Sequence, residues 1–167
     1  MQKGNRLGFF TNPERQNAIE CLNYALFKAK KLGYSCCVNS EIRNRVSAAA
    51  PTFEEAAPDM IIAFGGDGTI LHAAVPAYTY GVPILGVNLG RIGFLSEVPP
   101  GEVDDALIRI ERDEYTLDPR MMLSCSVNGG ENRLCLNEAL LYKRSFSGVV
   151  DISMEIDGKN AGSVLCD

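Results

Sequence analysis

The segment IIAFGGDGTILHAA, residues 61–74, places three glycines, an aspartate and a threonine between two apolar stretches. Glycines let a backbone approach a phosphate without interference from Cβ atoms, and Gly65, Gly66 and Gly68 fit that task. Asp67 would repel a bare phosphate. Its presence therefore indicates either an intervening cation or a carboxylate that addresses a hydroxyl group about to lose its proton.

An ordinary tight turn is the simplest alternative, because Asp-Gly pairs are common in turns. The flanks argue against a hairpin, since one side is typical of a buried strand and the other of a helix. The glycine spacing matches neither the GxGxxG fingerprint of dinucleotide-binding folds nor the GxxxxGK[ST] P-loop, so both classes are disfavoured.

The surrounding sequence predicts the elements that position this turn. Residues 60–64 are apolar throughout, which is typical of a parallel strand buried on both faces, and residues 69–80 have a helical pattern. Further strands are expected at residues 6–10, 34–38 and 83–88, further helices at residues 14–32 and 102–114, and a loop or short helix at residues 40–58. The alternation predicts an α/β fold with an open, mainly parallel, Rossmann-like sheet.

The pattern changes after residue 115. Strand-like segments at residues 122–129, 134–142 and 149–158 are joined by turns rich in Asn, Asp and Gly, which predicts the beginning of a mainly antiparallel β domain. We expect an α/β nucleotide-binding domain at residues 1–116 and an incomplete all-β domain at residues 117–167. About 50 residues of β structure bury too little surface to be stable alone, so we expect completion elsewhere.

Composition excludes several classes of partner. The 167-residue chain has a formal net charge of −5 and no long basic run, which argues against binding to nucleic acid or to an anionic membrane. It contains no signal-peptide pattern and no apolar run long enough to span a membrane. Six cysteines without metal-site spacing indicate reduced thiols and a cytoplasmic location.

Several stretches together resemble a known family. GGDGT after an apolar strand is shared by NAD kinases, by diacylglycerol and sphingosine-type lipid kinases and, more loosely, by phosphofructokinases. GVNLGRIGFLSE at 86–97 and LNEALLYKR at 136–144 are similar to NAD kinase segments, and RMML at 120–123 and GSVLCD at 162–167 match in place and order. The Gly-Thr-x-Asn-Asp stretch expected of lipid kinases is absent. The chain is identified as a member of the NAD kinase family, over nearly its whole length.

The resemblance implies an enzyme, an NAD⁺ kinase that moves the γ-phosphoryl group of ATP, with Mg²⁺ or another divalent cation, to the 2′-hydroxyl of the adenosine ribose of NAD. Asp67 is implied to orient or deprotonate this hydroxyl. The residues implied to cradle the donor phosphates are Gly65, Gly66, Gly68 and Thr69. The residues implied to contact NAD are His72, Phe94, Asn137, Glu138 and Asp167, with Phe94 beside the adenine and Asp167 on the nicotinamide side. The family's full-length members are typically homodimers or homotetramers.

Two other functions remain open at this point. One is a lipid or other small-alcohol kinase of the same superfamily, and the other is a truncated, inactive nucleotide-binding module. Without the resemblance, His72 is as easily a core or surface histidine, Phe94 a core aromatic, and Asn137 with Glu138 a turn at a sheet edge.

Overall fold

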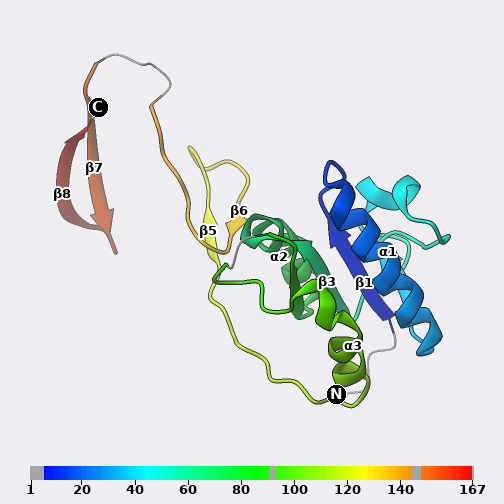
Figure 1. Ribbon diagram of the computed structural model, residues 1–167. Coiled ribbons are helices and arrows are strands. Elements are labelled where there is room, and N and C mark those ends of the chain that lie inside the picture. The colour runs from blue at the N-terminus through cyan, green and yellow to red at the C-terminus, as the bar shows by residue number, and fades with distance from the viewer. Residues whose placement is uncertain (1–5, 91–92, 144–147, 167) are drawn as a thin grey trace. The chain divides into compact units, whose positions relative to one another are not determined.

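The computed structural model describes residues 6–90, 93–143 and 148–166 and divides into two compact units, Met1–Asn137 and Glu138–Asp167. Four parallel strands form the sheet of the first unit (Figure 1). In spatial order these are β2 (Ser35–Val38), β1 (Arg6–Thr11), β3 (Met60–Gly65) and β4 (Ile84–Asn88). The open parallel sheet predicted from the sequence is confirmed.

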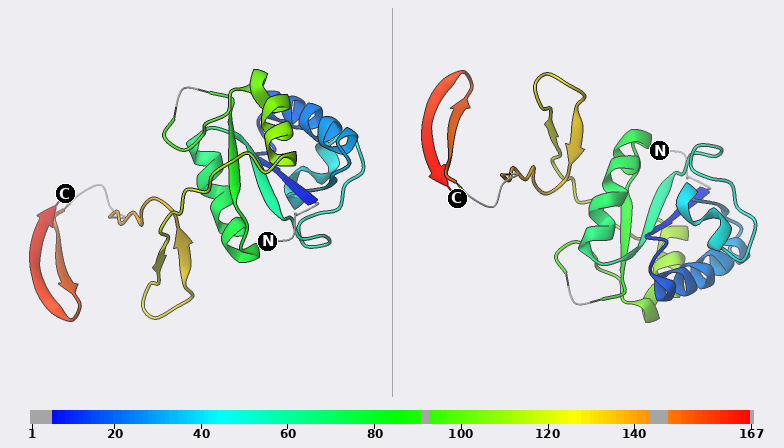
Figure 2. Two further views of the ribbon diagram at one scale, coloured as in Figure 1. Left: turned by 90° about the horizontal axis from the view of Figure 1, so that it is seen from below. Right: turned by 90° about the horizontal axis from the view of Figure 1, so that it is seen from above.

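Helices cover both faces of this sheet, with α1 and α3 on one face and α2 on the other (Figures 1 and 2). The α-helices are α1 (Gln16–Lys31), α2 (Asp67–Tyr80) and α3 (Val103–Glu111), and short 3₁₀ turns are η1 (Ser40–Arg45) and η2 (Pro100–Glu102). Each predicted helix is present; α2 ends at Tyr80 as predicted, and the other helix ends differ from the prediction by one to three residues. Sequence patterns locate the apolar face of a helix better than its termini, which depend on local capping.

Strand β3 is buried at all six residues, as its continuous apolar sequence predicts. Ile62 and Phe64 pack on the face covered by α1 and α3, where the Phe64 ring stacks on Phe9 with ring centroids 6.2 Å apart. Ile61 and Ala63 point to the other face and pack against α2. Side chains alternate along a strand, so burial on both faces requires an apolar residue at every position.

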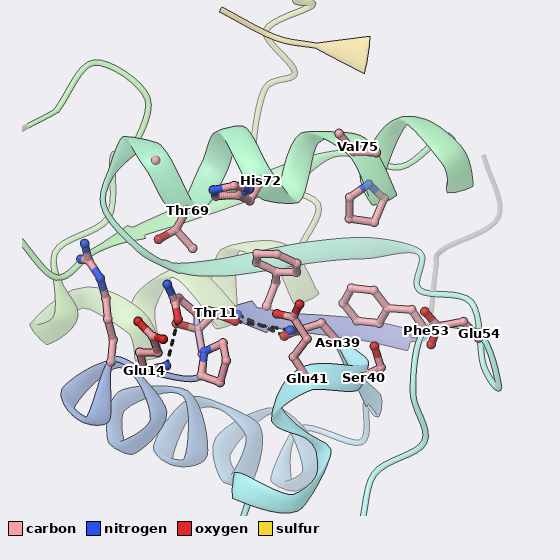
Figure 3. Close-up of a pocket in the computed structure, with 16 residues that line it drawn as sticks. Thr11, Glu14, Asn39, Ser40, Glu41, Phe53, Glu54, Thr69, His72 and Val75 are labelled. Carbon is pink, nitrogen blue, oxygen red and sulfur yellow. Dashed lines mark hydrogen bonds between the residues drawn. The ribbon is translucent and has the colours of Figure 1, made fainter. Parts of the chain in front are cut away.

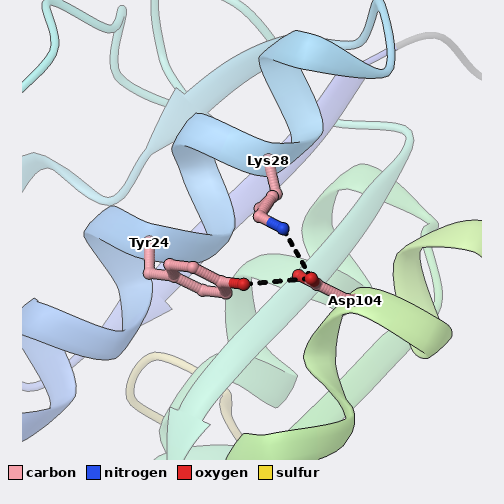
Figure 4. A network of polar contacts seen from close by, with 3 residues as sticks. All are labelled: Tyr24, Lys28 and Asp104. Carbon is pink, nitrogen blue, oxygen red and sulfur yellow. Dashed lines mark hydrogen bonds and ion pairs between the residues drawn. The ribbon is translucent and has the colours of Figure 1, made fainter.

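The two helices on the first face are joined by a polar contact (Figure 4). The Lys28 ammonium group and the Tyr24 hydroxyl, both on α1, donate to Oδ2 of Asp104 on α3, at 2.6 and 3.0 Å. The hydrogen bond between Lys28 and Asp104 raises the pKa of Lys28 and lowers the pKa of Asp104. Both side chains are about one-third or more exposed to solvent, so water screens the pair.

Antiparallel pairs follow, as predicted. In the first unit β5 (Leu123–Cys125) pairs with β6 (Arg133–Cys135), and in the second unit β7 (Val150–Ile156) pairs with β8 (Lys159–Cys166). The predicted Asp-Gly turn connects β7 to β8, and positive φ angles of 51° and 73° at its two residues suit a tight hairpin.

Two predicted strands are shorter than expected. The segment at residues 122–129 is strand only over Leu123–Cys125. The segment at residues 134–142 is strand only to Cys135, because β6 pairs with β5 over three residues and has no longer partner in the described chain. The predicted domain boundary near residue 116 stays a prediction. In the parts that the structure describes, no helix combines the length and apolar character needed to cross a membrane.

Packing of apolar side chains, more than the polar contact, should hold α3 in place. Leu107 is 1% exposed in the core, so Leu107→Ala is expected to lower the free energy of unfolding by about 2–5 kcal/mol. Lys28→Met removes the positive charge of the screened pair and keeps an apolar stem. This variant is expected to change the free energy of unfolding by a small fraction of the loss in Leu107→Ala. Urea unfolding followed by circular dichroism measures both. A larger loss in Lys28→Met than in Leu107→Ala would contradict this ranking.

Candidate functional site

The GGDGT segment forms the turn between β3 and α2. Gly66 is extended (φ −100°, ψ −170°), and its carbonyl accepts the N–H groups of Thr69 at 2.9 Å and Ile70 at 3.4 Å. These bonds start the helix at Asp67, two residues before the predicted start. The N–H groups of Asp67 and Gly68 therefore lie in the first turn, where no partner exists inside the helix and anions are favoured.

The three glycines of this turn have different tasks. A Cβ atom on Gly65 would lie 2.1 Å from Oγ1 and 2.7 Å from Cβ of Thr69, so only glycine fits there without a shift of α2. A Cβ on Gly66 or Gly68 would meet nothing within 4 Å. Gly65 is thus needed for packing, whereas Gly66 and Gly68 border open space where a ligand could approach the backbone.

A cavity of about 780 Å³ lies beside this turn, at the carboxyl ends of β1 and β2 (Figure 3). Strands β2 and β3 lie on opposite sides of β1, so the order of the strands reverses at β1. The cavity therefore lies at the switch point where open α/β sheets bind ligands. Thr69 and His72 project from α2 toward the loop that follows β1 (Figure 3). The structure therefore brings His72 together with Gly68 and Thr69.

Polar side chains that were not predicted from the sequence connect the ends of the strands beside this cavity through hydrogen bonds. The Thr11 hydroxyl donates to the Phe64 carbonyl at 2.7 Å. The Asn39 side chain accepts the Thr11 N–H at 3.2 Å and donates to the Thr11 carbonyl at 3.3 Å. All three strands β1, β2 and β3 are thereby fixed at one edge. The only sequence signal was a polar residue at the end of each apolar run.

The cavity lining is acidic. Three glutamates, Glu14, Glu41 and Glu54, line it together with one arginine, Arg15, and with His72. A triphosphate entering without a counter-ion would meet net repulsion from these carboxylates. The lining thus suits a ligand whose phosphates are already neutralised by a cation.

The Asp67 carboxylate is held by the loop that follows β4. Its Oδ2 accepts the N–H of Phe94 at 2.8 Å, and its Oδ1 accepts the N–H of Leu95 at 3.1 Å and the hydroxyl of Ser96 at 3.4 Å. These bonds, with that of Phe94 the strongest, lower the pKa of Asp67 despite the opposing effect of desolvation. Their contribution to stability is complete above the ordinary pKa of aspartate and is lost as pH falls through the lowered value.

Gly93 and Ser96 belong to the site although sequence reasoning did not select them. A Cβ on Gly93 would lie 2.1 Å from Oδ1 of Asp67, so the loop approaches the carboxylate as closely as it does only because residue 93 is glycine. Both residues lie inside the GVNLGRIGFLSE stretch, which was the available signal. Arg91 and Ile92 of this stretch lie outside the described residues.

Phe94 is 98% exposed, so the alternative that it is a core aromatic is wrong. It borders a second hollow of about 320 Å³, also lined by Leu95, Ile84 and Leu136. A fully exposed phenyl ring beside an apolar hollow is an unusual surface feature and provides a flat face on which a base can stack. Its placement beside adenine stays a prediction.

The structure does not test the remaining predicted residues. Asn137 ends the first unit and Glu138 begins the second, and both side chains are exposed. Asp167 lies outside the described residues. Their roles toward NAD stay predictions. Among the residues with defined positions, no group of three or more His, Cys, Asp or Glu side chains could hold a metal ion.

Comparisons with known proteins identify relatives of this arrangement. The family model for the ATP-NAD kinase N-terminal domain matches residues 4–115. An NAD kinase of Gemmatimonas aurantiaca is 32% identical over 151 residues, which are 87% of this chain and 52% of the relative. An NAD kinase of Rhodococcus jostii is 39% identical over 126 residues, which are 70% of this chain and 39% of the relative. The chain thus spans about half, or less, of the curated relatives it matches.

Two solved structures share the fold. Yeast NADH kinase complexed with NADH superposes with a TM-score of 0.80 at 17% identity, covering 100% of this chain and 54% of the other. An NAD kinase from Archaeoglobus fulgidus in complex with ATP superposes with a TM-score of 0.68 at 23% identity, covering 97% and 58%. The expected fold, a parallel α/β sheet followed by antiparallel strands, is confirmed.

The different tasks of the glycines can be separated by stability. Gly65→Ala is expected to lower the free energy of unfolding by about 1–3 kcal/mol, because the new Cβ overlaps Thr69. Gly68→Ala is expected to leave it unchanged or to raise it by up to about 1 kcal/mol, because alanine favours the helix and meets open space. Urea titration compares the two. Equal losses in both variants would show that the turn needs glycine for backbone conformation alone.

Proposed function

This chain belongs to the NAD kinase family, and we propose that it binds ATP and NAD and moves the γ-phosphoryl group of ATP to the 2′-hydroxyl of the adenosine ribose of NAD. The product is NADP, and the enzyme class is a phosphotransferase with an alcohol acceptor. The relatives are named NAD kinases, and the structural neighbours are named for NADH and ATP complexes, which supports these substrates. No relative named here supports a lipid kinase.

The position of Asp67 between two hollows is the observation that supports this reaction best. Gly68 and Thr69, which follow it, line the larger cavity, and Phe94 and Leu95, which donate to its carboxylate, line the smaller hollow. A donor phosphate at the start of α2 and an acceptor nucleoside at Phe94 would meet at this carboxylate. Transfer between two bound nucleotides needs such a meeting point, because enzymes accelerate phosphoryl transfer mainly by positioning and electrostatics.

Asp67 is better suited to orient the acceptor hydroxyl than to remove its proton early. Its lowered pKa makes it a weak base at neutral pH. A loose transition state for phosphoryl transfer demands little proton removal before the bond to the leaving group breaks. The carboxylate would then accept the hydroxyl hydrogen bond, align the oxygen with phosphorus, and receive the proton late.

The larger cavity is proposed to hold ATP as its magnesium complex. The unpaired N–H groups at the start of α2, with Gly66 and Gly68 open to ligand, suit the phosphates. Magnesium supplies charge neutralisation, which the acidic lining makes necessary. It usually keeps several waters and binds mainly through substrate phosphates, so the absence of a metal-binding cluster among described residues fits this ion.

The other expectations from the sequence complete the proposal. Phe94 would stack on the adenine of NAD, and His72 would contact a nucleotide from the wall of the larger cavity. Asn137, Glu138 and Asp167 would hold the rest of NAD. We further propose a cytoplasmic location, which six cysteines without a disulfide support, and a homodimer or homotetramer.

Formation of NADP from NAD and Mg-ATP tests the reaction directly. Asp67→Asn is expected to reduce the rate roughly 10²–10⁴-fold, the usual contribution of a positioned acid–base group. Asp105→Asn is the matched control, because Asp105 is exposed on α3 and is expected to leave the rate unchanged. Wild-type chain that binds NAD and ATP without forming NADP would favour the inactive nucleotide-binding module.

Binding of ATP in the larger cavity can be tested without turnover. Gly68→Val places a branched side chain in open space on the cavity wall and is expected to weaken Mg-ATP binding at least about tenfold, which corresponds to about 1.4 kcal/mol. Isothermal titration calorimetry measures the affinity, and circular dichroism verifies the fold. Unchanged affinity in a folded variant would place the donor elsewhere.

A further inference from the structure

We propose that Asp67 has a second role in this reaction, as the anchor that positions the acceptor-binding loop, and that Ser96 is a positioning residue acting through it. The inference rests on the proposed function, since it assigns the loop at residues 93–96 to the acceptor. It goes further by assigning a different role to each oxygen of the Asp67 carboxylate.

The loop is attached to the fold at two places, at Phe94 and Leu95 through the Asp67 carboxylate and at residues 97 and 98 through β4. On the C-terminal side of Phe94, the N–H groups of Glu97 and Val98 donate to the Gly86 carbonyl of β4, at 3.2 and 3.0 Å. At Phe94 and Leu95 the N–H groups donate to Asp67 instead of to a strand. The exposed Phe94 ring makes no core contact that could fix it, so the position of the ring depends on this carboxylate.

The two carboxylate oxygens are not equally occupied. A carboxylate oxygen has two lone pairs and can accept two hydrogen bonds. Among the described residues, Oδ1 accepts the Leu95 N–H and the Ser96 hydroxyl, and Oδ2 accepts the Phe94 N–H; the Ser96 N–H also acts on this carboxylate. Because Leu95 and the Ser96 hydroxyl occupy Oδ1, we assign the acceptor hydroxyl to Oδ2, and Ser96 keeps Oδ1 from competing for it.

Close approach of the loop leaves no room for any residue larger than glycine at position 93. A Cβ there would lie 2.1 Å from Oδ1, 2.6 Å from Cγ and 2.7 Å from Oδ2 of Asp67. The overlap involves the whole carboxylate, which is short and fixed at the start of α2. Gly93→Ala would therefore push the loop away while the Asp67 carboxylate itself stays at the start of α2.

Hydrogen exchange of the ligand-free 167-residue chain, followed by NMR, tests the anchor without any substrate. In Asp67→Asn, the side-chain NH₂ group, which is a donor, replaces one carboxylate oxygen and must face at least one backbone N–H donor. The Phe94 and Leu95 N–H groups should therefore exchange with solvent roughly 10- to 100-fold faster than in the wild-type chain, as expected for the loss of hydrogen bonds to a charged acceptor. The amide of Ile62 in β3 reports whether the fold is intact. Unchanged exchange at Phe94 and Leu95 in a folded variant would overturn the proposal.

Steady-state kinetics then separates the anchor from the hydroxyl contact. Gly93→Ala should raise KM for NAD at least about fivefold with a smaller effect on kcat, because the loop moves while the carboxylate remains. Ser96→Ala should lower kcat about 2- to 10-fold with little change in KM, because the loop stays attached through two N–H groups. Ser96→Thr keeps the hydroxyl and should restore kcat, and Ser47→Ala, at an exposed serine, is the matched control.

The two proposals fail in different ways. Faster exchange in Asp67→Asn without NADP formation by the wild-type chain would leave the anchor in place and refute the kinase reaction for this chain. NADP formation by the wild-type chain, together with equal amide exchange at Phe94 and Leu95 in the wild type and in Asp67→Asn, would support the kinase reaction and refute the anchor. A kcat for Ser96→Ala equal to that of Ser47→Ala would refute the positioning role of Ser96.

Discussion

The hydrogen bonds between the Asp67 carboxylate and the backbone of residues 94 and 95 depend on one constraint, the parallel register of β3 and β4. Gly65 pairs with Asn88, so the turn after β3 and the segment after β4 leave the sheet at the same edge. Only then can a carboxylate in the first turn of α2 meet N–H groups 27 and 28 positions later in the chain. Packing of β3 on both faces favours this register, because a slipped register would exchange the side chains packed against α1 and α3 with those packed against α2.

Opposing charges meet at the larger cavity. The start of α2 favours anions through its unpaired N–H groups, whereas three glutamates on the opposite walls and Asp67 itself disfavour them. In the proposed function, this balance would favour a neutralised phosphate over a free one. The glutamates would then be acceptors for hydroxyl groups, which a nucleoside has and inorganic phosphate chains lack.

Much of the architecture could be predicted because it depends on local patterns. The uninterrupted apolar run of β3 indicated two buried faces, and the spacing of Val103, Leu107 and Ile110 indicated the buried face of α3. Contacts between distant segments could not be predicted in this way. Thr11 with Asn39 and Asp67 with Ser96 are joined only by folding, and a sequence shows no period or spacing for such pairs. The alternative of a core aromatic at Phe94 was wrong for the same reason, since aromatic residues are usually buried and the exposure of Phe94 follows from the loop path.

The direct junction of β3 and α2 has a mechanical consequence. Gly66 is the sole residue between the strand and the helix, so α2 has no flexible linker at its start. The N–H groups proposed to face a donor phosphate and the carboxylate proposed to face an acceptor therefore belong to one rigid body, and a shift of the helix would displace both by the same amount. Adjustment between the two substrates would then involve residues 93–96, which are attached to α2 by hydrogen bonds and not by a direct continuation of the backbone.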